Sequence, residues 1–248
     1  YYNLLKYFMN GKNELDILIP VFNENETIIK TIKNIKSVVN FNFNLLICYD
    51  YDEDPTIKII NDNFPNDKNI IFIKNFSTGF NNALISGFKN TTAKAILIYM
   101  ADDHTNHNMI NLCYQKFKEG YDVVCPSRFV KGGKMIGNPI AKGLLTKLVS
   151  FFLFNFTSFP IKDSTNSFRL FSKELIDKIK VESNKGFTLS LELTAKAHRL
   201  NYKIVEIPTV WIERDKGKSR FKIFSFIIPY SKWFIYIIKT SFLKKNEK

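Results

Sequence analysis

Two carboxylates and an imidazole follow an apolar run near the middle of the chain. The run at residues 95–100 predicts a buried strand, and Asp102, Asp103 and His104 come directly after it. Unpaired carboxylates are costly to bury, so a core strand seldom ends in them for packing alone. Hard divalent cations prefer oxygen ligands, and open α/β sheets bind ligands at the carboxyl ends of their strands. The cluster therefore predicts a metal site, with a turn that caps the next helix as the alternative.

Three further polar clusters follow predicted strands, at residues 19–26, 48–56 and 163–169. Singly, each fits an ordinary cap or turn. Together, on one edge of one sheet, they indicate a site for a nucleotide and a metal ion. The sequence has neither a GxGxxG after its first strand nor a GxxxxGK[ST]. A bound diphosphate would therefore need a cation and basic side chains in place of a glycine-rich cradle.

Strands and helices alternate along the first half of the chain, which predicts an α/β fold with a mainly parallel sheet. The pattern then changes to a basic, glycine-containing loop at 131–139 and a strongly apolar helix at 140–156. The expected strands are 15–20, 45–49, 69–74, 95–100, 122–125, 168–171 and 203–210, and the expected helices are 26–39, 55 onward, 81–89, 109–118 and 189–198.

Composition limits the classes of partner. The 248 residues are 45% hydrophobic and carry a net charge of +13, which suits phosphate-rich partners. Nucleic acid is disfavoured, because the aromatic residues are not interleaved with the basic patches. The three cysteines, Cys48, Cys113 and Cys125, lack metal-binding spacing and predict buried free thiols in a reducing compartment. Residues 1–8 show no secretory leader.

Four motifs carry a resemblance to a known family. Residues 17–25, Ile-Leu-Ile-Pro-Val-Phe-Asn-Glu-Asn, resemble the opening motif of family 2 glycosyltransferases, which have the GT-A fold. Segments 127–133, 163–169 and 214–221 are similar to motifs of the branch that transfers sugars to dolichyl or polyprenyl phosphate. The resemblance implies a Rossmann-like nucleotide-sugar-binding domain over residues 15–221, after an N-terminal extension at 1–14.

The metal motif departs from the family pattern. The family's Asp-x-Asp is Met100-Ala101-Asp102 here, so the first metal-facing carboxylate is missing. Asp102 matches the second carboxylate, and His104 stands where the family often has a glutamine that assists the metal. We expect Mg²⁺ or Mn²⁺ to be held by Asp102 with His104 or, in a shifted register, Asp103.

The resemblance also implies roles for other residues. In sugar transfer, negative charge builds on the departing diphosphate, where a divalent ion and arginine side chains stabilise it. The residues expected to bind nucleotide are Pro20, Phe22, Glu24, Asp50, Asp52, Arg214 and Arg220. Those expected to bind the acceptor are Arg128, Lys131, Ser167 and Arg169, and those expected in catalysis are Asp102, Arg128, Asp163, Glu192 and Arg214.

The acceptor decides what catalysis requires. A phosphate monoester is already an anion near neutral pH and needs no general base, whereas an alcohol needs one, with Asp163 or Glu192 as candidates. The leading interpretation is an inverting hexosyltransferase that uses a GDP- or UDP-sugar and a polyprenyl or dolichyl phosphate. The alternatives are a saccharide or other hydroxyl acceptor, and a degenerate relative that only binds nucleotide-sugar.

The C-terminal segment 222–248 predicts an amphipathic helix with a basic tail. A narrow stripe with Lys222, Lys232 and Lys239 interrupts an otherwise apolar surface that includes Trp233. Such a helix is unsuited to crossing a bilayer but suits its interface, as does helix 140–156, so we expect a peripheral protein at the cytoplasmic face of a membrane. Docking on the domain's own core or on a second copy is the alternative, and an integral-membrane partner stays open.

Overall fold

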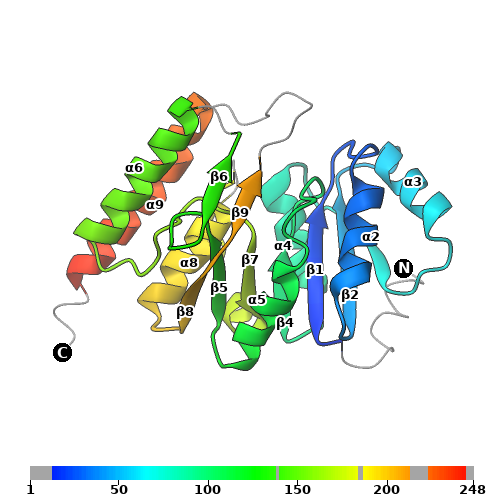
Figure 1. Cartoon of the computed structure of the whole chain (residues 1–248), viewed down its shortest axis with the longest axis horizontal. Coiled ribbons are helices and arrows are strands. Elements are labelled where there is room, and N and C mark those ends of the chain that lie inside the picture. The colour runs from blue at the N-terminus through cyan, green and yellow to red at the C-terminus, as the bar shows by residue number, and fades with distance from the viewer. Residues whose placement is uncertain (1–12, 138–139, 184–186, 213–222, 244–248) are drawn as a thin grey trace.

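A seven-stranded sheet forms the centre of the computed structural model, which describes residues 13–137, 140–183, 187–212 and 223–243 (Figure 1). The strand order is β3-β2-β1-β4-β7-β5-β8, and β7 runs antiparallel to its neighbours β4 and β5 while the remaining pairs are parallel. The strands are β1 (Leu15–Pro20), β2 (Phe43–Tyr49), β3 (Ile70–Lys74), β4 (Ala95–Ile98), β5 (Val123–Ser127), β7 (Arg169–Ser172) and β8 (Ile204–Pro208). The predicted α/β class with a mainly parallel sheet is confirmed.

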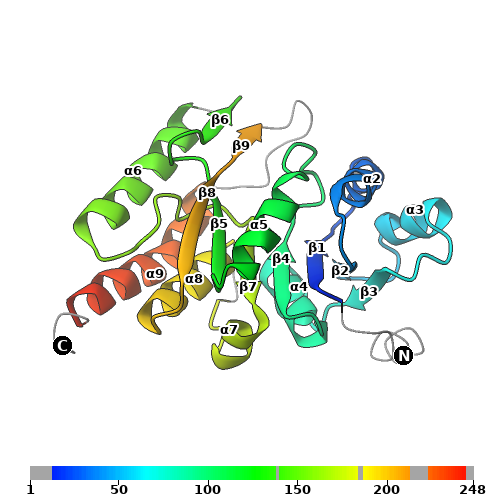
Figure 2. The same ribbon diagram turned by 60° about the horizontal axis from the view of Figure 1, so that its bottom comes forward.

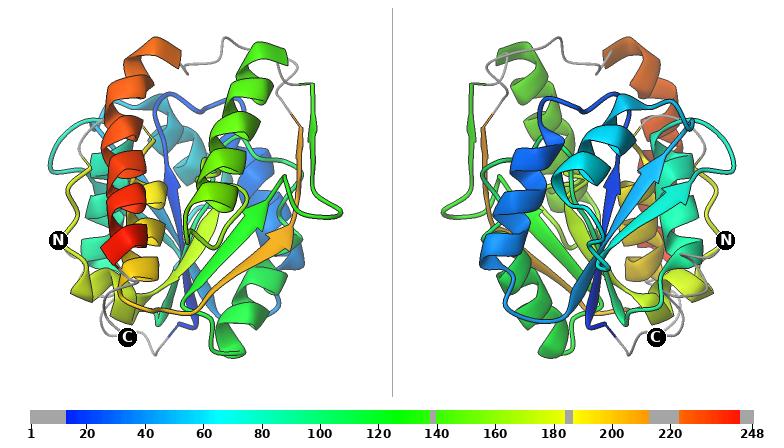
Figure 3. Two further views of the ribbon diagram at one scale, coloured as in Figure 1. Left: turned by 90° about the vertical axis from the view of Figure 1, so that its left-hand side faces the viewer. Right: turned by 90° about the vertical axis from the view of Figure 1, so that its right-hand side faces the viewer.

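Helices cover both faces of the sheet because the central strands are apolar on both sides. On one face, Leu15 and Ile17 of β1 share a core with α2 (Ile28–Val38), α3 (Pro55–Asn63) and α5 (Met109–Lys118). On the other face, Leu18 packs with α4 (Phe80–Asn90), α7 (Lys173–Lys178) and α8 (Leu189–Arg199). At the β8 end of the sheet, α6 (Ile140–Phe156) and α9 (Ile223–Leu243) lie side by side (Figures 1 and 3).

Three elements differ from the sequence prediction. The predicted loop 131–139 contains β6 (Lys134–Ile136), which pairs in parallel with β9 (Val210–Ile212) as a separate two-stranded sheet (Figure 2). The predicted strand 203–210 is accordingly divided at Thr209, whose amide donates to the carbonyl of Ser127 and whose carbonyl accepts from the amide of Lys134. The short helix α7 was not predicted, and the side chain of Ser172 caps its start by accepting from the amide of Leu175.

Helix α9 packs on the domain's own core. Tyr230, Trp233 and Ile237 belong to the same buried cluster as residues of α8. The indole Nε1 of Trp233 donates to Ser183 Oγ at 2.9 Å, and Lys232 pairs with Glu182 at 2.9 Å. The expectation that Trp233 lies in a membrane interface is therefore wrong, because an apolar stripe at helical spacing fits a protein core as well as a lipid surface.

Within the described residues, no helix is long and apolar enough to cross a bilayer. The expected domain boundary at residue 222 and most of the expected N-terminal extension fall outside the described ranges.

The docking of α9 makes Trp233 a stability determinant. We expect Trp233→Ala to lower the free energy of unfolding by about 3–5 kcal/mol, because it leaves a cavity and removes the bond to Ser183. Ile235 is 51% exposed on the same helix, and Ile235→Ala serves as the control, with an expected change within about 0.5 kcal/mol. Urea unfolding of both variants measures this, and equal small effects would show that α9 does not dock as described.

Candidate functional site

Five loops meet at one edge of the main sheet. The segments after β1, β2, β4 and β5 leave the carboxyl ends of strands that run in the same direction. The segment 163–168 joins them because it precedes β7, which runs the opposite way. The topology thus brings the four polar clusters of the sequence to a common edge, as expected, and this is where open α/β sheets bind ligands.

The buried Asp54 ties the first two loops together. Its carboxylate accepts from the amide of Asn23 at 3.1 Å and, as the N-cap of α3, from the amide of Thr56 at 2.9 Å. Thr56 Oγ1 in turn accepts from the amide of Glu24 at 2.9 Å. Sequence reasoning did not single out Asp54 or Thr56, although Asp followed by Pro and Thr is a helix-start signal that could have found them. These bonds fix the path of the loop that carries the expected nucleotide contacts.

Phe22 is a large apolar side chain that the first loop leaves exposed. It is 44% exposed, and its ring meets that of Tyr51 edge to face with centroids 5.8 Å apart. The Tyr51 hydroxyl also donates to Asn23 Oδ1, so the second loop contacts the first at both Phe22 and Asn23. Pro20 ends β1 and is half-buried, and Glu24 is half-buried with its carboxylate accepting from the Thr27 hydroxyl at 3.2 Å. This loop offers an aromatic surface of the kind that a nucleobase can stack on.

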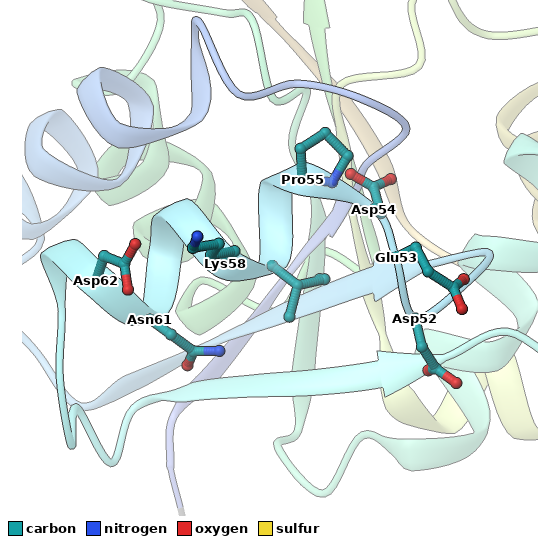
Figure 4. A pocket seen from close by; sticks show the side chains of 8 residues that line it. Asp52, Glu53, Asp54, Pro55, Lys58, Asn61 and Asp62 are labelled. Carbon is teal, nitrogen blue, oxygen red and sulfur yellow. The ribbon is translucent and has the colours of Figure 1, made fainter.

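The carboxylates of the second loop have other partners in the structure. Asp50 accepts from Asn75 Nδ2 at 2.7 Å and from the amide of Gly79 at 3.1 Å, which holds the start of α4. Asp52 is exposed and pairs with Lys74. Figure 4 shows Asp52 and Glu53 lining a hollow along α3, with Asp54 turned away from them. Acidic side chains around this hollow are unsuited to a diphosphate, so we do not place the nucleotide there.

Asp103 has a structural role in the turn after β4. It is buried, and its carboxylate accepts from the amides of Thr105 and Asn106, both at 3.0 Å, and from Asn106 Nδ2 at 2.8 Å. The side-chain oxygen Oδ1 of Asn106 accepts from the Thr209 hydroxyl at 2.6 Å. This bond links the turn after β4 to the junction of β8 and β9. The bonds argue against the expectation that Asp103 is a metal ligand. They close the turn after β4 and do not cap the next helix, because the N-cap of α5 is Asn108, which makes no side-chain cap bond.

Asp102 and His104 are half-buried on the same turn. Thr31 Oγ1 of α2 lies 3.3 Å from His104 Nδ1 and donates to the carbonyl of Ala101 at 2.7 Å. The described residues contain no group of three His, Cys, Asp or Glu side chains that could hold a metal ion. A carboxylate and an imidazole nevertheless suit a divalent ion such as Mn²⁺, provided that the remaining ligands are phosphate oxygens of a nucleotide. The donor set thus fits a metal that binds together with its nucleotide.

Arg128 and Asp163 form a bidentate ion pair at the other end of the site. Arg128 Nε and Nη2 each donate to the Asp163 carboxylate at 2.7 Å, its amide donates at 2.9 Å, and Nη2 also donates to Thr165 Oγ1 at 2.8 Å. Burial alone would raise the pKa of Asp163, but the charge and hydrogen bonds of Arg128, with a smaller effect of Arg169, hold that pKa below its usual value. Asp163 is therefore a poor general base.

Arg169 does not reach an acceptor. It is fully buried, and it donates to the carbonyls of Ser190 and Asp163 and to Thr194 Oγ1 at 2.6–2.9 Å. The expectation that Arg169 binds the acceptor is wrong, because its guanidinium joins β7 to α8 and to the loop that carries Asp163. The apolar neighbours of Arg169 in the sequence gave a signal for this burial, since Phe168 and Leu170 are both core residues.

Glu192 also has a structural role. It is fully buried, accepts from the amides of Glu182 and Ser183 at 2.7 Å each, and pairs with Lys196 at 2.7 Å. These bonds anchor the loop before α8 and argue against a role as a general base. Lys196 stands four residues after Glu192 on the helix, and this spacing is a sequence signal for an ion pair.

The remaining expected residues lie around the edge of the site. Lys131 is exposed on a turn at the end of β5, and Ser167 is half-buried before β7. Gly133 is required in this turn, since a Cβ there would lie 2.5 Å from the carbonyl oxygen of Ser127. Arg214 and Arg220 lie outside the described residues.

The chain is similar in sequence to several known glycosyltransferases. The dolichol-phosphate mannosyltransferase of Pyrococcus furiosus is 24% identical over 84% of this chain and 59% of its own length. The undecaprenyl-phosphate mannosyltransferase of Micrococcus luteus is 23% identical over 82% of this chain and 85% of its own. A Bacillus subtilis glycosyltransferase without assigned function is 28% identical over 87% of this chain and 65% of its own. The chain thus spans about three fifths of the first of these relatives and slightly less than two thirds of the third.

The fold has solved counterparts. Glucosyl-3-phosphoglycerate synthase of Mycobacterium tuberculosis, in complex with Mn²⁺, UDP and glucosyl-3-phosphoglycerate, matches with a TM-score of 0.67 at 14% identity, over 92% of this chain and 80% of that one. The match confirms the predicted GT-A architecture. The family model of glycosyl transferase family 2 matches residues 16–180, a range that contains most of the site residues described above. This chain therefore belongs to glycosyl transferase family 2.

Proposed function

We propose that the protein is an inverting glycosyltransferase that moves a hexose from a GDP- or UDP-sugar to a polyprenyl or dolichyl phosphate. One observation carries the choice of acceptor: both carboxylates that could act as a general base are tied up in structural bonds. Asp163 is paired with Arg128, and Glu192 is bonded to two backbone amides and Lys196. A phosphate acceptor brings its own negative charge, so it needs no base.

The donor half of the site supplies binding and charge stabilisation in this proposal. Phe22 and Glu24 lie on the anchored loop after β1, where they can contact the nucleoside. Asp102 and His104 would hold Mg²⁺ or Mn²⁺ with the phosphates, and a bound divalent ion supplies Lewis-acid stabilisation of the departing diphosphate. Arg214 and Arg220 are proposed to add charge-assisted bonds to the same phosphate oxygens.

The acceptor half is proposed to attract the lipid phosphate. Lys131 is exposed on the turn after β5, three residues beyond Arg128, and Ser167 lies in the segment that leads from Asp163 to β7. Arg128 is proposed to act mainly by positioning this loop, since it donates four hydrogen bonds to Asp163 and Thr165. A hydroxyl acceptor is the second candidate function, and it would require Asp163 or Glu192 to leave these partners.

Helix α6 is the surface that we propose meets the membrane. Large apolar side chains are exposed along it at Leu144, Leu148, Phe151, Phe152 and Phe156. Lys147 lies among them, and Lys162 stacks on the ring of Phe154 with Nζ 5.1 Å from its centroid. An exposed apolar face flanked by lysines suits the interface of an anionic bilayer, where a polyprenyl phosphate is found. The protein would thus act as a peripheral enzyme at the cytoplasmic face.

A donor screen tests the proposed reaction. Radiolabelled GDP- and UDP-sugars are incubated with polyprenyl phosphate, and label in the organic extract is counted. We expect one donor to give a lipid-linked product, and Asp102→Ala to lower its rate by about 10²–10³ because charge stabilisation is lost. Asp62→Ala, an exposed change on α3, is the control and is expected to leave the rate unchanged. No extractable product with any donor would contradict the proposal.

Vesicle flotation tests the proposed membrane face. We expect the double variant Leu148→Ser, Phe151→Ser to lose most binding to anionic vesicles, because each large apolar side chain buried in the interface contributes about 1.5–3 kcal/mol. Phe76→Ser, an equally exposed change in the loop after β3, is expected to float like the parent. If both variants float equally well, α6 is not the membrane contact.

The lowered pKa of Asp163 predicts a pH-dependent stability. Because its pKa is lower in the folded state, the carboxylate stabilises the fold above its unfolded pKa of about 3.9, and this contribution is lost as the pH falls through the folded value. Asp163→Asn should cost about 3–5 kcal/mol near pH 7, since it leaves Arg128 without its partner. In urea unfolding, the difference between parent and variant should shrink below about pH 4. A variant as stable as the parent at pH 7 would mean that Asp163 is not held in the ion pair.

A further inference from the structure

Thr31 lies directly beneath the turn that carries Asp102 and His104. It belongs to α2, whose neighbouring residues Ile28 and Ile32 are buried in the core, and it is itself fully buried. Its side chain contacts two parts of the turn, the carbonyl of Ala101 at 2.7 Å and the Nδ1 of His104 at 3.3 Å. Because Thr31 lies on the buried face of α2, the packing of this helix holds its hydroxyl against the turn.

The two contacts of Thr31 determine which ring nitrogen of His104 carries the proton. The Thr31 hydroxyl has one hydrogen, and its short bond to the Ala101 carbonyl uses it. Towards His104, the same oxygen then offers lone pairs alone, so Nδ1 must be the donor. A neutral imidazole has a single N–H, and the lone pair therefore lies on Nε2.

We propose that Thr31 is a positioning residue that holds His104 as the Nδ1–H tautomer and so presents Nε2 to a divalent ion. Metal-binding histidines commonly donate their other N–H to a neighbouring oxygen, which fixes the ring and raises the basicity of the ligating nitrogen. The inference deepens the proposed function and rests on its metal site. In this proposal Ala101 also has a role, because its backbone carbonyl accepts the hydroxyl proton of Thr31 and so directs that proton away from the imidazole.

The position of Thr31 matters because the turn has few metal-binding side chains. Asp103 is occupied by the amides of Thr105 and Asn106, and position 101 is an alanine. A site built on Asp102 and His104 with nucleotide phosphates depends strongly on the orientation of its one imidazole. Loss of such an outer contact typically weakens metal affinity about 10–100-fold.

Two measurements on the full chain test this inference. The first is ¹⁵N NMR of histidine-labelled protein at a pH about two units above the ordinary histidine pKa, with His104 assigned by comparison with His104→Gln. The parent and Thr31→Ser should show a protonated Nδ1 at His104, and Thr31→Val should lose this preference. The second is Mn²⁺ binding in the presence of UDP or GDP, followed by the electron paramagnetic resonance signal of free Mn²⁺. Thr31→Val should bind Mn²⁺ about 10–100-fold more weakly than the parent, and Thr31→Ser should bind like the parent.

The outcomes separate this inference from the proposed function. If the parent binds Mn²⁺ with nucleotide and Thr31→Val binds it equally well, the role of Thr31 is refuted while the metal site stands. A parent His104 with an unprotonated Nδ1 refutes it as well. If the parent binds no Mn²⁺ with either nucleotide, the proposed metal site fails and the inference fails with it. Thermal unfolding of both Thr31 variants shows that they are folded, and a change in stability without a change in tautomer counts against the proposal.

Discussion

The buried ion pair between Asp163 and Arg128 is the interaction on which the acceptor half of the structure depends. Arg128 follows β5 and Asp163 precedes β7, so the pair joins two loops that are 35 residues apart in sequence. Removing one partner of a buried pair leaves an uncompensated charge, which makes such a pair a strong constraint on geometry. The backbone carbonyl of Asp163 also accepts from the buried Arg169, so the loop is held at both its side chain and its main chain. The same bonds lower the basicity of Asp163, and the site therefore suits an acceptor that is already an anion.

Three other buried carboxylates also hold loops in place. Asp54 holds the loops after β1 and β2 together, Asp103 closes the turn after β4, and Glu192 anchors the loop before α8. Each accepts from backbone amides, which are donors that must be satisfied where water is excluded. Most of the acidic residues that suggest a reaction centre in the sequence therefore fix the conformation of the loops. Asp102 and His104 are then the side chains of the turn after β4 that suit a metal, and the chemistry proposed here is binding and charge stabilisation.

The elements with strong periodicity could be predicted from sequence, and several packing partners could not. The strand Leu15–Pro20 and the helices Met109–Lys118 and Ile140–Phe156 have the predicted bounds, because their apolar spacing is unambiguous. The sequence alone does not separate a membrane interface from a core for Trp233, because the spacing of an apolar stripe does not reveal what covers it. The sequence predicts an acceptor contact for Arg169 because it shows the charge of a side chain but not its burial. The antiparallel direction of β7 was equally hidden, since strand direction depends on the connection and not on the strand's own residues.

The most direct test compares two acceptors that differ only in the phosphate. Polyprenyl phosphate and the polyprenol of the same length are presented in identical vesicles with the preferred nucleotide-sugar, and initial rates of transfer are measured across neutral pH. We expect transfer to the phosphate and none to the alcohol, because Asp163 and Glu192 are held in structural bonds and neither can take a proton from a hydroxyl. Comparable transfer to the polyprenol would show that one of these carboxylates acts as a base, and would contradict the account.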